Sequence, residues 1–190
     1  MEPAIIPPDT LLGAYMQGVF PMGEEGEIVW VSTKVRGIIP LDDRFHIPHG
    51  LRKKLSKKPF EIRLDTAFRE VMLGCAGRES TWIDDVILGS YCRLHELGFA
   101  HSVECWDEDG LQGGLYGVAY GKAFFGESMF SRKTDASKIA LVALVEMLRD
   151  RGFKLLDTQW MTDHLRSFGG CEMEREKYLE LLAQSIKPDA

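Results

Sequence analysis

The chain has 190 residues, of which 45% are hydrophobic and 27% charged, and its formal net charge is −6. These values are typical of a globular protein and exclude a disordered, collagen-like or coiled-coil chain. The length suits one domain, or one domain with a small appendage. No stretch approaches the roughly 20 apolar residues that span a bilayer, and the N-terminus lacks a signal-peptide pattern, so we expect a cytoplasmic protein without a membrane partner.

The first third of the chain predicts a small α/β unit. A helix capped by Asp9 or Thr10 is expected to end at 18–21, and an acidic glycine-rich turn follows. Two short strands are expected at 28–31 and 37–41. A basic helix should then run over 49–58 and stop at Pro59.

The remainder alternates strands and helices. We expect a strand at 60–64, a helix capped by Asp65, a helix starting near Asp84 and Asp85, and an antiparallel meander over 101–130. A helix capped by Asp135, a strand at 154–160 and a last helix at 174–186 follow. This order predicts an α+β fold with a mixed sheet flanked by helices, divided near Phe60 into domains 1–59 and 60–190.

The cysteine and histidine spacings favour neither a metal nor a disulfide framework. The four cysteines are far apart and form no CxxC pair, and the five histidines show no HExxH spacing. We therefore expect reduced thiols, no metal site and no cofactor. Walker, GxGxxG and GxSxG motifs are also absent from the sequence, which disfavours nucleotide hydrolysis and serine hydrolase chemistry.

Two short motifs carry polar groups in apolar surroundings. In LLDTQW, Asp157 and Gln159 share one face of a strand, so they form either a structural hydrogen-bond network or a site, with the network the commoner case. In GESMFSR, Glu127 follows an apolar strand and either orients a polar substrate or pairs with Arg132 across a turn.

A run of five cations and a set of apolar side chains are less specific. The cations fit either a solvated helix face or contacts with several phosphates, and they are Arg52, Lys53, Lys54, Lys57 and Lys58. The apolar residues fit an ordinary core better than a binding pocket, and they are Trp30, Trp82, Leu115, Phe124 and Met129.

Several segments together resemble the leucyl/phenylalanyl-tRNA–protein transferases of bacteria. They are LLGAYMQGVFPM, STWI, LHELGFAHSVE, GGLYGVAYGKAFFGESMFSR, ASKIALVAL and LLDTQ followed by DHLRSFG. The resemblance implies a small N-terminal domain before an N-acyltransferase fold. It also implies transfer of Leu, Phe or Met from charged tRNA to proteins that begin with Arg or Lys, which creates an N-degron for degradation.

The same resemblance assigns roles to residues. Asp157 and Gln159 match the catalytic pair and Glu127 the substrate-orienting acid. A neutral amide is too weak a base to take a proton unaided near pH 7, so we expect Asp157 to fix Gln159 and both to orient the attacking amine. The resemblance gives the aminoacyl and adenosine pocket as Trp30, Trp82, Leu115, Phe124, Met129, Ser131, Leu144 and Thr162.

The basic run would then hold the tRNA acceptor stem, and the protein is expected to act as a monomer. The chain departs from the family pattern at Val31, where Trp is usual, at Leu115, where Met is common, and at Thr162, where Asn is common. Two rival functions remain: a tRNA-binding module without transfer activity, and an N-acetyltransferase that uses acetyl-CoA. The N-acetyltransferase function is disfavoured, because those enzymes usually have a glycine-rich loop before the long helix and this sequence has FSRKTDAS there.

Overall fold

The computed structural model describes residues 4–77 and 81–187. Its main sheet has seven strands in the order β4, β5, β6, β7, β8, β3, β9. All neighbours are antiparallel except β7 and β8, which are parallel. The strands are β3 (Val35–Ile39), β4 (Glu61–Leu64), β5 (Ala100–Asp107), β6 (Gly110–Tyr120), β7 (Ala123–Ser131), β8 (Leu155–Gln159) and β9 (Cys171–Glu174). This mixed sheet flanked by helices confirms the expected α+β fold.

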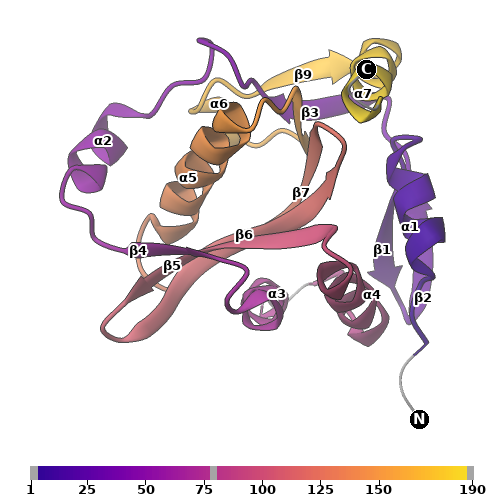
Figure 1. Cartoon of the computed structure of the whole chain (residues 1–190), viewed down its shortest axis with the longest axis horizontal. Helices are drawn as coiled ribbons and strands as arrows, with labels where there is room; N and C mark the ends of the chain where they lie inside the picture. The colour runs from indigo at the N-terminus through magenta and orange to yellow at the C-terminus, as the bar shows by residue number, and fades with distance from the viewer. Residues whose placement is uncertain (1–3, 78–80, 188–190) are drawn as a thin grey trace.

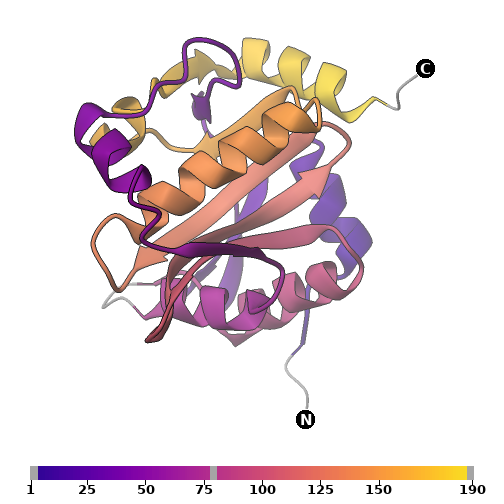
Figure 2. The same cartoon turned by 60° about the vertical axis from the view of Figure 1, so that its left-hand side comes forward.

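Helices cover both faces of this sheet (Figures 1 and 2). The long helix α5 (Ala136–Asp150) connects β7 to β8 and packs along one face. The opposite core is built with α1 (Pro8–Tyr15), α3 (Phe68–Ala76), α4 (Asp85–Glu96) and α7 (Arg175–Ile186). Two shorter helices, α2 (His49–Leu55) and α6 (Asp163–Arg166), complete the described helices.

Strand alternation divides the buried residues between these two cores. Leu115, Phe124 and Leu156 belong to the core under α5, while their neighbours Tyr116, Phe125 and Leu155 belong to the other. Because successive strand residues point to opposite faces, each strand of the sheet's centre supplies both layers.

A second, two-stranded sheet lies near α1 and pairs β1 (Phe20–Glu24) with β2 (Glu27–Val31). The sequence pattern predicts a turn in place of β1, because Pro21 and Gly23 disfavour strands. The structure places both in a short hairpin, where a proline is tolerated at an edge. The third N-terminal strand, β3, leaves this unit and inserts between β8 and β9. The division into domains at residue 59 stays a prediction. Strand β3 belongs to the first of these domains by sequence, but it pairs with β8 and β9 of the second.

Several expected helix ends differ from the structure. Asp65 does not cap α3: it has a positive φ of 56° and accepts a hydrogen bond from the Ser102 amide. The Glu104 carboxylate accepts from the Thr66 and Ala67 amides instead. Asp135 has no capping bond to α5, and the basic helix ends at Leu55, before Lys57 and Lys58. At Asp65 and Asp135 a tertiary partner outweighs the local capping preference.

Helix α4 begins where the sequence predicts, and Asp84 caps it, which gives a stability prediction. Its Oδ1 accepts from the Ile87 amide at 2.8 Å, so Asp84→Ala should lower the free energy of unfolding by about 1 kcal/mol. Urea denaturation measures this. Asp85→Ala is the control, because Asp85 lies in the first turn but makes no capping bond, and an equal loss from both variants would contradict the capping role.

Candidate active site

A cavity of about 350 Å³ opens where the parallel strands β7 and β8 separate. The two strands pair only as far as Phe125 and Asp157. Beyond that point Gly126 to Met129 and Thr158 to Gln159 line the cavity. The chain turns sharply at Gln159, whose φ is +60°. The gap between diverging strand ends is a common place for a ligand site.

One end of the cavity is apolar. Leu115 from β6, Met129 from β7 and Leu156 from β8 meet Leu141 and Leu144 from α5 there. A flexible methionine among leucines fits a linear or γ-branched side chain of varied shape. This end can therefore hold an apolar group the size of a large amino-acid side chain.

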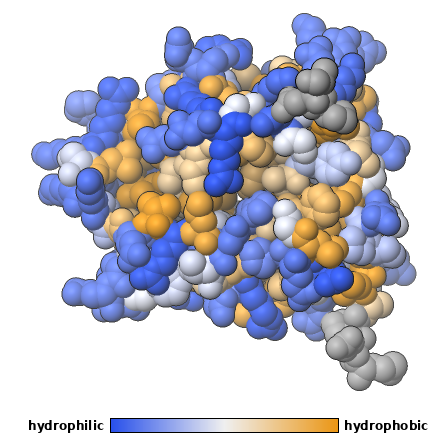
Figure 3. All heavy atoms as spheres, in the orientation of Figure 1, coloured by the Kyte–Doolittle hydropathy of each residue, from blue (hydrophilic) through white to orange (hydrophobic). Residues whose placement is uncertain are grey.

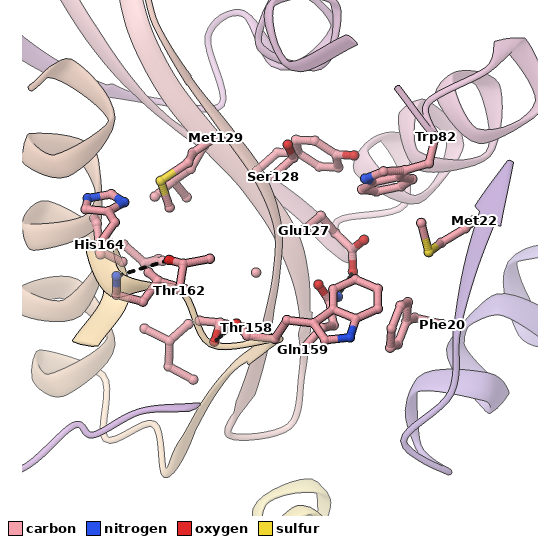
Figure 4. Close-up of a pocket in the computed structure, with 18 residues that line it drawn as sticks. Phe20, Met22, Trp82, Glu127, Ser128, Met129, Thr158, Gln159, Thr162 and His164 are labelled. Atoms are coloured by element: carbon pink, nitrogen blue, oxygen red, sulfur yellow. Dashed lines mark hydrogen bonds between the residues drawn. The ribbon is translucent and has the colours of Figure 1, made fainter. Parts of the chain in front are cut away.

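Glu127 lies away from this apolar end, on the side of the cavity where Trp82, Met22 and Phe20 also lie (Figure 4). Its Oε1 accepts hydrogen bonds from the Tyr15 hydroxyl at 2.5 Å and from the Gln159 amide nitrogen at 2.9 Å. Its Oε2 is buried and has no partner among the described residues, and the same is true of the Tyr116 hydroxyl. Both residues line the cavity. Buried polar atoms are normally hydrogen-bonded, so these two atoms keep hydrogen-bonding capacity that the described residues do not use.

Burial is the main cause that raises the pKa of Glu127 to about 7. The charge on Asp157 adds to this rise, and the hydrogen bonds from Tyr15 and Gln159 oppose it. Tyr15 is itself hydrogen-bonded to Tyr91, and burial raises the pKa of both phenols well above the usual value. The phenols therefore stay protonated, and Glu127 is the group at this end whose charge changes near neutral pH.

Asp157 lies beneath the cavity and does not line it. Its side chain is fully buried and makes an ion pair with Arg36, whose Nε and Nη2 both donate to it. It also accepts from the Tyr178 hydroxyl at 2.6 Å and from the Gln159 backbone amide at 2.8 Å. With both oxygens occupied, Asp157 fixes the backbone of Gln159 rather than meeting a ligand. Strand β8 therefore carries both a buried hydrogen-bond network, through Asp157, and a residue that lines the cavity, Gln159.

Arg36 completes this network, although none of the sequence motifs pointed to it. Arg36 is 1% exposed, lies between the Phe20 and Tyr178 rings and donates from Nη1 to the Gly18 carbonyl. A signal is present in the sequence: one arginine inside the apolar strand VRGII. A buried arginine requires a carboxylate partner, and Asp157 is the matching buried acid.

The structure places the expected pocket residues in three different locations. Trp82, Leu115, Met129, Leu144 and Thr162 line the cavity, together with Glu127 and Gln159. Phe124 packs in the core under α5, and Ser131 lines a second cavity beside the first. Trp30 is 42% exposed on the opposite face of the β1–β2 hairpin from Phe20 and Met22, in a groove along α1.

The cavity is also lined by residues that the sequence analysis did not assign to a pocket, among them Phe20, Met22, Trp160 and His164. Phe20 and Met22 come from β1, where the pattern predicts a turn, and His164 comes from the short helix α6. Figure 4 shows Met22 and Trp82 at one side of the cavity and Met129 and His164 at the other. The expected alternative of a Glu127–Arg132 pair is wrong, since Arg132 donates to the Leu111 carbonyl and Glu127 faces Tyr15 and Gln159.

The basic run is only partly free. Lys54 pairs with Asp135, and Arg52 donates to the Ile47 carbonyl. Lys53, Lys57 and Lys58 are exposed and have no ion-pair partner within residues 4–77 and 81–187. In that same part of the chain, no three His, Cys, Asp or Glu residues are grouped to hold a metal ion, and no helix is long and apolar enough to cross a membrane.

The cavity joins apolar side chains to a carboxylate and an amide, so it fits a ligand that carries an apolar group next to polar ones. Models of the leucyl/phenylalanyl-tRNA protein transferase match residues 38–183, and models of its N-terminal domain match residues 5–34. The chain therefore belongs to the leucyl/phenylalanyl-tRNA protein transferase family and is an aminoacyltransferase.

Two curated relatives are close to it. The leucyl/phenylalanyl-tRNA–protein transferase of Akkermansia muciniphila is 61% identical over 185 residues, covering 95% of this chain and 96% of the relative. That of Herpetosiphon aurantiacus is 50% identical over 183 residues, covering 96% of each. Among solved structures, that of L-PGS from Bacillus licheniformis has a TM-score of 0.49 and 12% identity, covering 90% of this chain and 67% of that one.

The Tyr15 hydrogen bond gives a prediction for the Glu127 carboxyl. Because the bond stabilises the carboxylate, Tyr15→Phe should raise the pKa of Glu127 above its wild-type value of about 7. NMR titration of ¹³C-labelled glutamate side chains measures the midpoint. Tyr120→Phe serves as a control outside the hydrogen-bond network of Glu127, and a midpoint unchanged in Tyr15→Phe would contradict the assignment.

Proposed function

We propose that this enzyme transfers Leu, Phe or Met from the 3′ end of a charged tRNA to the α-amine of proteins that begin with Arg or Lys. The observation that supports this most is the cavity itself, apolar at one end, with unpartnered Glu127 and Tyr116 oxygens at the other. The apolar end would take the donor side chain. The polar end would then lie beside the ester carbonyl and the amines.

The reaction is aminolysis of an ester. The acceptor nitrogen attacks the aminoacyl carbonyl carbon, the new C–N bond forms, and the C–O bond to the ribose breaks. The amine loses a proton and the ribose oxygen gains one. An α-amine has a pKa near 8, so part of it is already neutral at pH 7 and needs orientation more than a strong base.

Gln159 is suited to orient that amine. Its amide nitrogen donates to Glu127, and its backbone is held by Asp157, so the side chain is fixed at both ends. Its amide oxygen has no hydrogen bond within the described residues and can accept one from the attacking amine. The ionised Glu127 would hold the donor's own amino group. Asp157 is then a positioning residue, and its ion pair with Arg36 holds its carboxylate in place.

The shape of the apolar end supports a preference among donors. Leu, Phe and Met are unbranched at Cβ and can enter between Met129 and the leucines, whereas Val and Ile are stiff and wide at that atom. A difference of one methylene or methyl group changes the transition-state energy by about 1–3 kcal/mol. We therefore propose a preference rather than an exclusive choice. We further propose that the enzyme acts as a cytoplasmic monomer and that the product marks its protein as an N-degron.

A transfer assay tests the function. Purified protein is incubated with tRNA charged separately with labelled Leu, Phe, Met or Arg, and with peptides that begin with Lys, Arg, Asp or Ala. Label from Leu or Phe should appear on the Lys and Arg peptides. Label on Asp peptides, or from Arg-tRNA, would overturn the proposed specificity. Transfer from acetyl-CoA alone would favour an N-acetyltransferase, and tRNA binding without transfer would favour a binding module.

In the same assay Gln159→Ala should lower transfer at least tenfold while tRNA affinity changes little, since Gln159 meets the amine and not the nucleic acid. Asp157→Ala should lower transfer too, but it leaves Arg36 buried without its partner and so costs about 3–5 kcal/mol of stability. Gln17→Ala is the matched control, because it removes an exposed amide just after α1. Full transfer by Gln159→Ala would remove its assignment.

The free cations in and after α2 give a separate prediction for tRNA binding. Lys53, Lys57 and Lys58 replaced together by Gln should weaken tRNA binding and reduce the salt slope by up to about 0.9 for each phosphate that is no longer neutralised. Lys34, Lys154 and Lys177 replaced by Gln give the same change in net charge on other exposed sites. Filter binding at several salt concentrations measures both. Equal weakening by the two triple variants would contradict a local tRNA site.

A further inference from the structure

A second cavity of about 580 Å³ lies directly beside the first. The two cavities are adjacent, because Met129 and His164 line both of them. The remaining lining comes from the end of α3, the end of β7 and the start of α5, and it includes Gly74, Ser131, Arg132 and Ser137. A volume of this size is within the usual range of small-molecule sites.

The connection from β7 to α5 joins this cavity to the basic helix α2. Ser131 at the end of β7 accepts a hydrogen bond from the Ser137 amide at 2.9 Å. Between them Asp135 pairs with Lys54 of α2 and, at 3.0 Å, with Lys138. This ion pair places α2 beside the connection between β7 and α5, whose two ends line the second cavity.

Arg132 brings an unneutralised charge to the cavity. Its Nη1 donates to the Leu111 carbonyl at 2.9 Å, and its guanidinium lies 5.6 Å from the centre of the Phe130 ring. No carboxylate of residues 4–77 and 81–187 lies within ion-pair distance of it. The side chain is thus held in place with donors to spare, which suits a phosphate.

His164 adds a polar atom on the shared wall. Its Nε2 is buried and has no partner among the described residues. Burial and the nearby Lys138 lower the pKa of the ring, so the imidazole is neutral near pH 7 and can donate or accept one hydrogen bond. Such a group fits a ribose hydroxyl or a base edge better than a phosphate.

The opposite side of the first cavity has the other sign of charge. The β1–β2 hairpin carries three acidic side chains, Glu24, Glu25 and Glu27. The Gly23 amide of this hairpin donates a hydrogen bond to the Trp82 carbonyl, which brings the hairpin close to a further acid, Asp84. In Figure 1 this hairpin and α2 lie at opposite ends of the molecule. A polyanion that reaches the first cavity is repelled from the hairpin side and attracted from the Arg132 side.

We propose that the second cavity binds the unpaired nucleotides that precede the terminal adenosine of the tRNA, with Arg132 on their phosphodiester and His164 on a ribose or base. The proposal rests on the proposed function and adds the route by which the tRNA end reaches the first cavity. It leaves the acidic hairpin side to the acceptor protein. Single-stranded RNA ends are bound in this way, by cations along the backbone and polar groups on the bases.

The test compares two donors that share the leucyl group and the terminal adenosine. One of them also has the preceding unpaired nucleotides and the rest of the tRNA. Leucyl-tRNA has them, and a 3′-leucyl adenosine does not. Arg132→Gln should lower kcat/KM about tenfold more for leucyl-tRNA than for leucyl adenosine, and it should reduce the salt slope of tRNA binding by about 0.7. Arg132→Lys should recover part of the loss. Arg93→Gln, exposed on α4, is the charge-matched control, and thermal unfolding checks that each variant folds.

Each outcome decides the proposal. A selective loss with leucyl-tRNA in Arg132→Gln but not in Arg93→Gln supports it. Equal losses with both donors, or no loss with either, would overturn it. If the wild-type protein transfers from neither donor, the proposed function fails, and the site is then judged by binding alone: an RNA hairpin with a CCA end should bind more tightly than one without it, and Arg132→Gln should abolish that difference.

Discussion

The buried ion pair between Arg36 and Asp157 is the interaction on which the rest of the site depends. Asp157 is 0% exposed and Arg36 is 1% exposed, so each charge is tolerated only because the other is present. The pair also makes hydrogen bonds to three other parts of the chain. It fixes Gln159 through its backbone amide, it orders α7 through the Tyr178 hydroxyl, and it binds the Gly18 carbonyl that follows α1. The reactive end of the cavity is thereby built on a rigid base.

Above this base the polar groups of the cavity depend on one another. Gln159 and Glu127 share a hydrogen bond, and Glu127 is held in turn by Tyr15 from α1. Strand β8, strand β7 and helix α1 therefore meet at a single carboxylate. This convergence explains why α1, although it precedes the main sheet, forms part of the same hydrophobic core as β7 and α4.

Much of this molecule is predictable from its sequence, because the strongest signals are periodic. The helices α4, α5 and α7 and the meander of β5, β6 and β7 carry clear apolar patterns, and the D-x-Q and GESMFSR motifs point to Asp157, Gln159 and Glu127. The sequence could not show that Trp30 faces away from the cavity while Met22 faces it, because the proline and glycine of β1 are more typical of a turn. Nor could it pair Arg36 with Asp157, since the matching acid is fixed by strand order alone.

That strand order determines when the site can exist. Arg36 and Asp157 are 121 positions apart, and β3 takes its place in the sheet only between β8 and β9. Contacts so distant along the chain form late and carry a large entropic cost of loop closure. During synthesis, β3 therefore cannot pair with β8 and β9 until almost the whole chain has been made. A nascent or truncated chain lacking β8 has no base for the cavity, so the transfer site is a property of the finished protein.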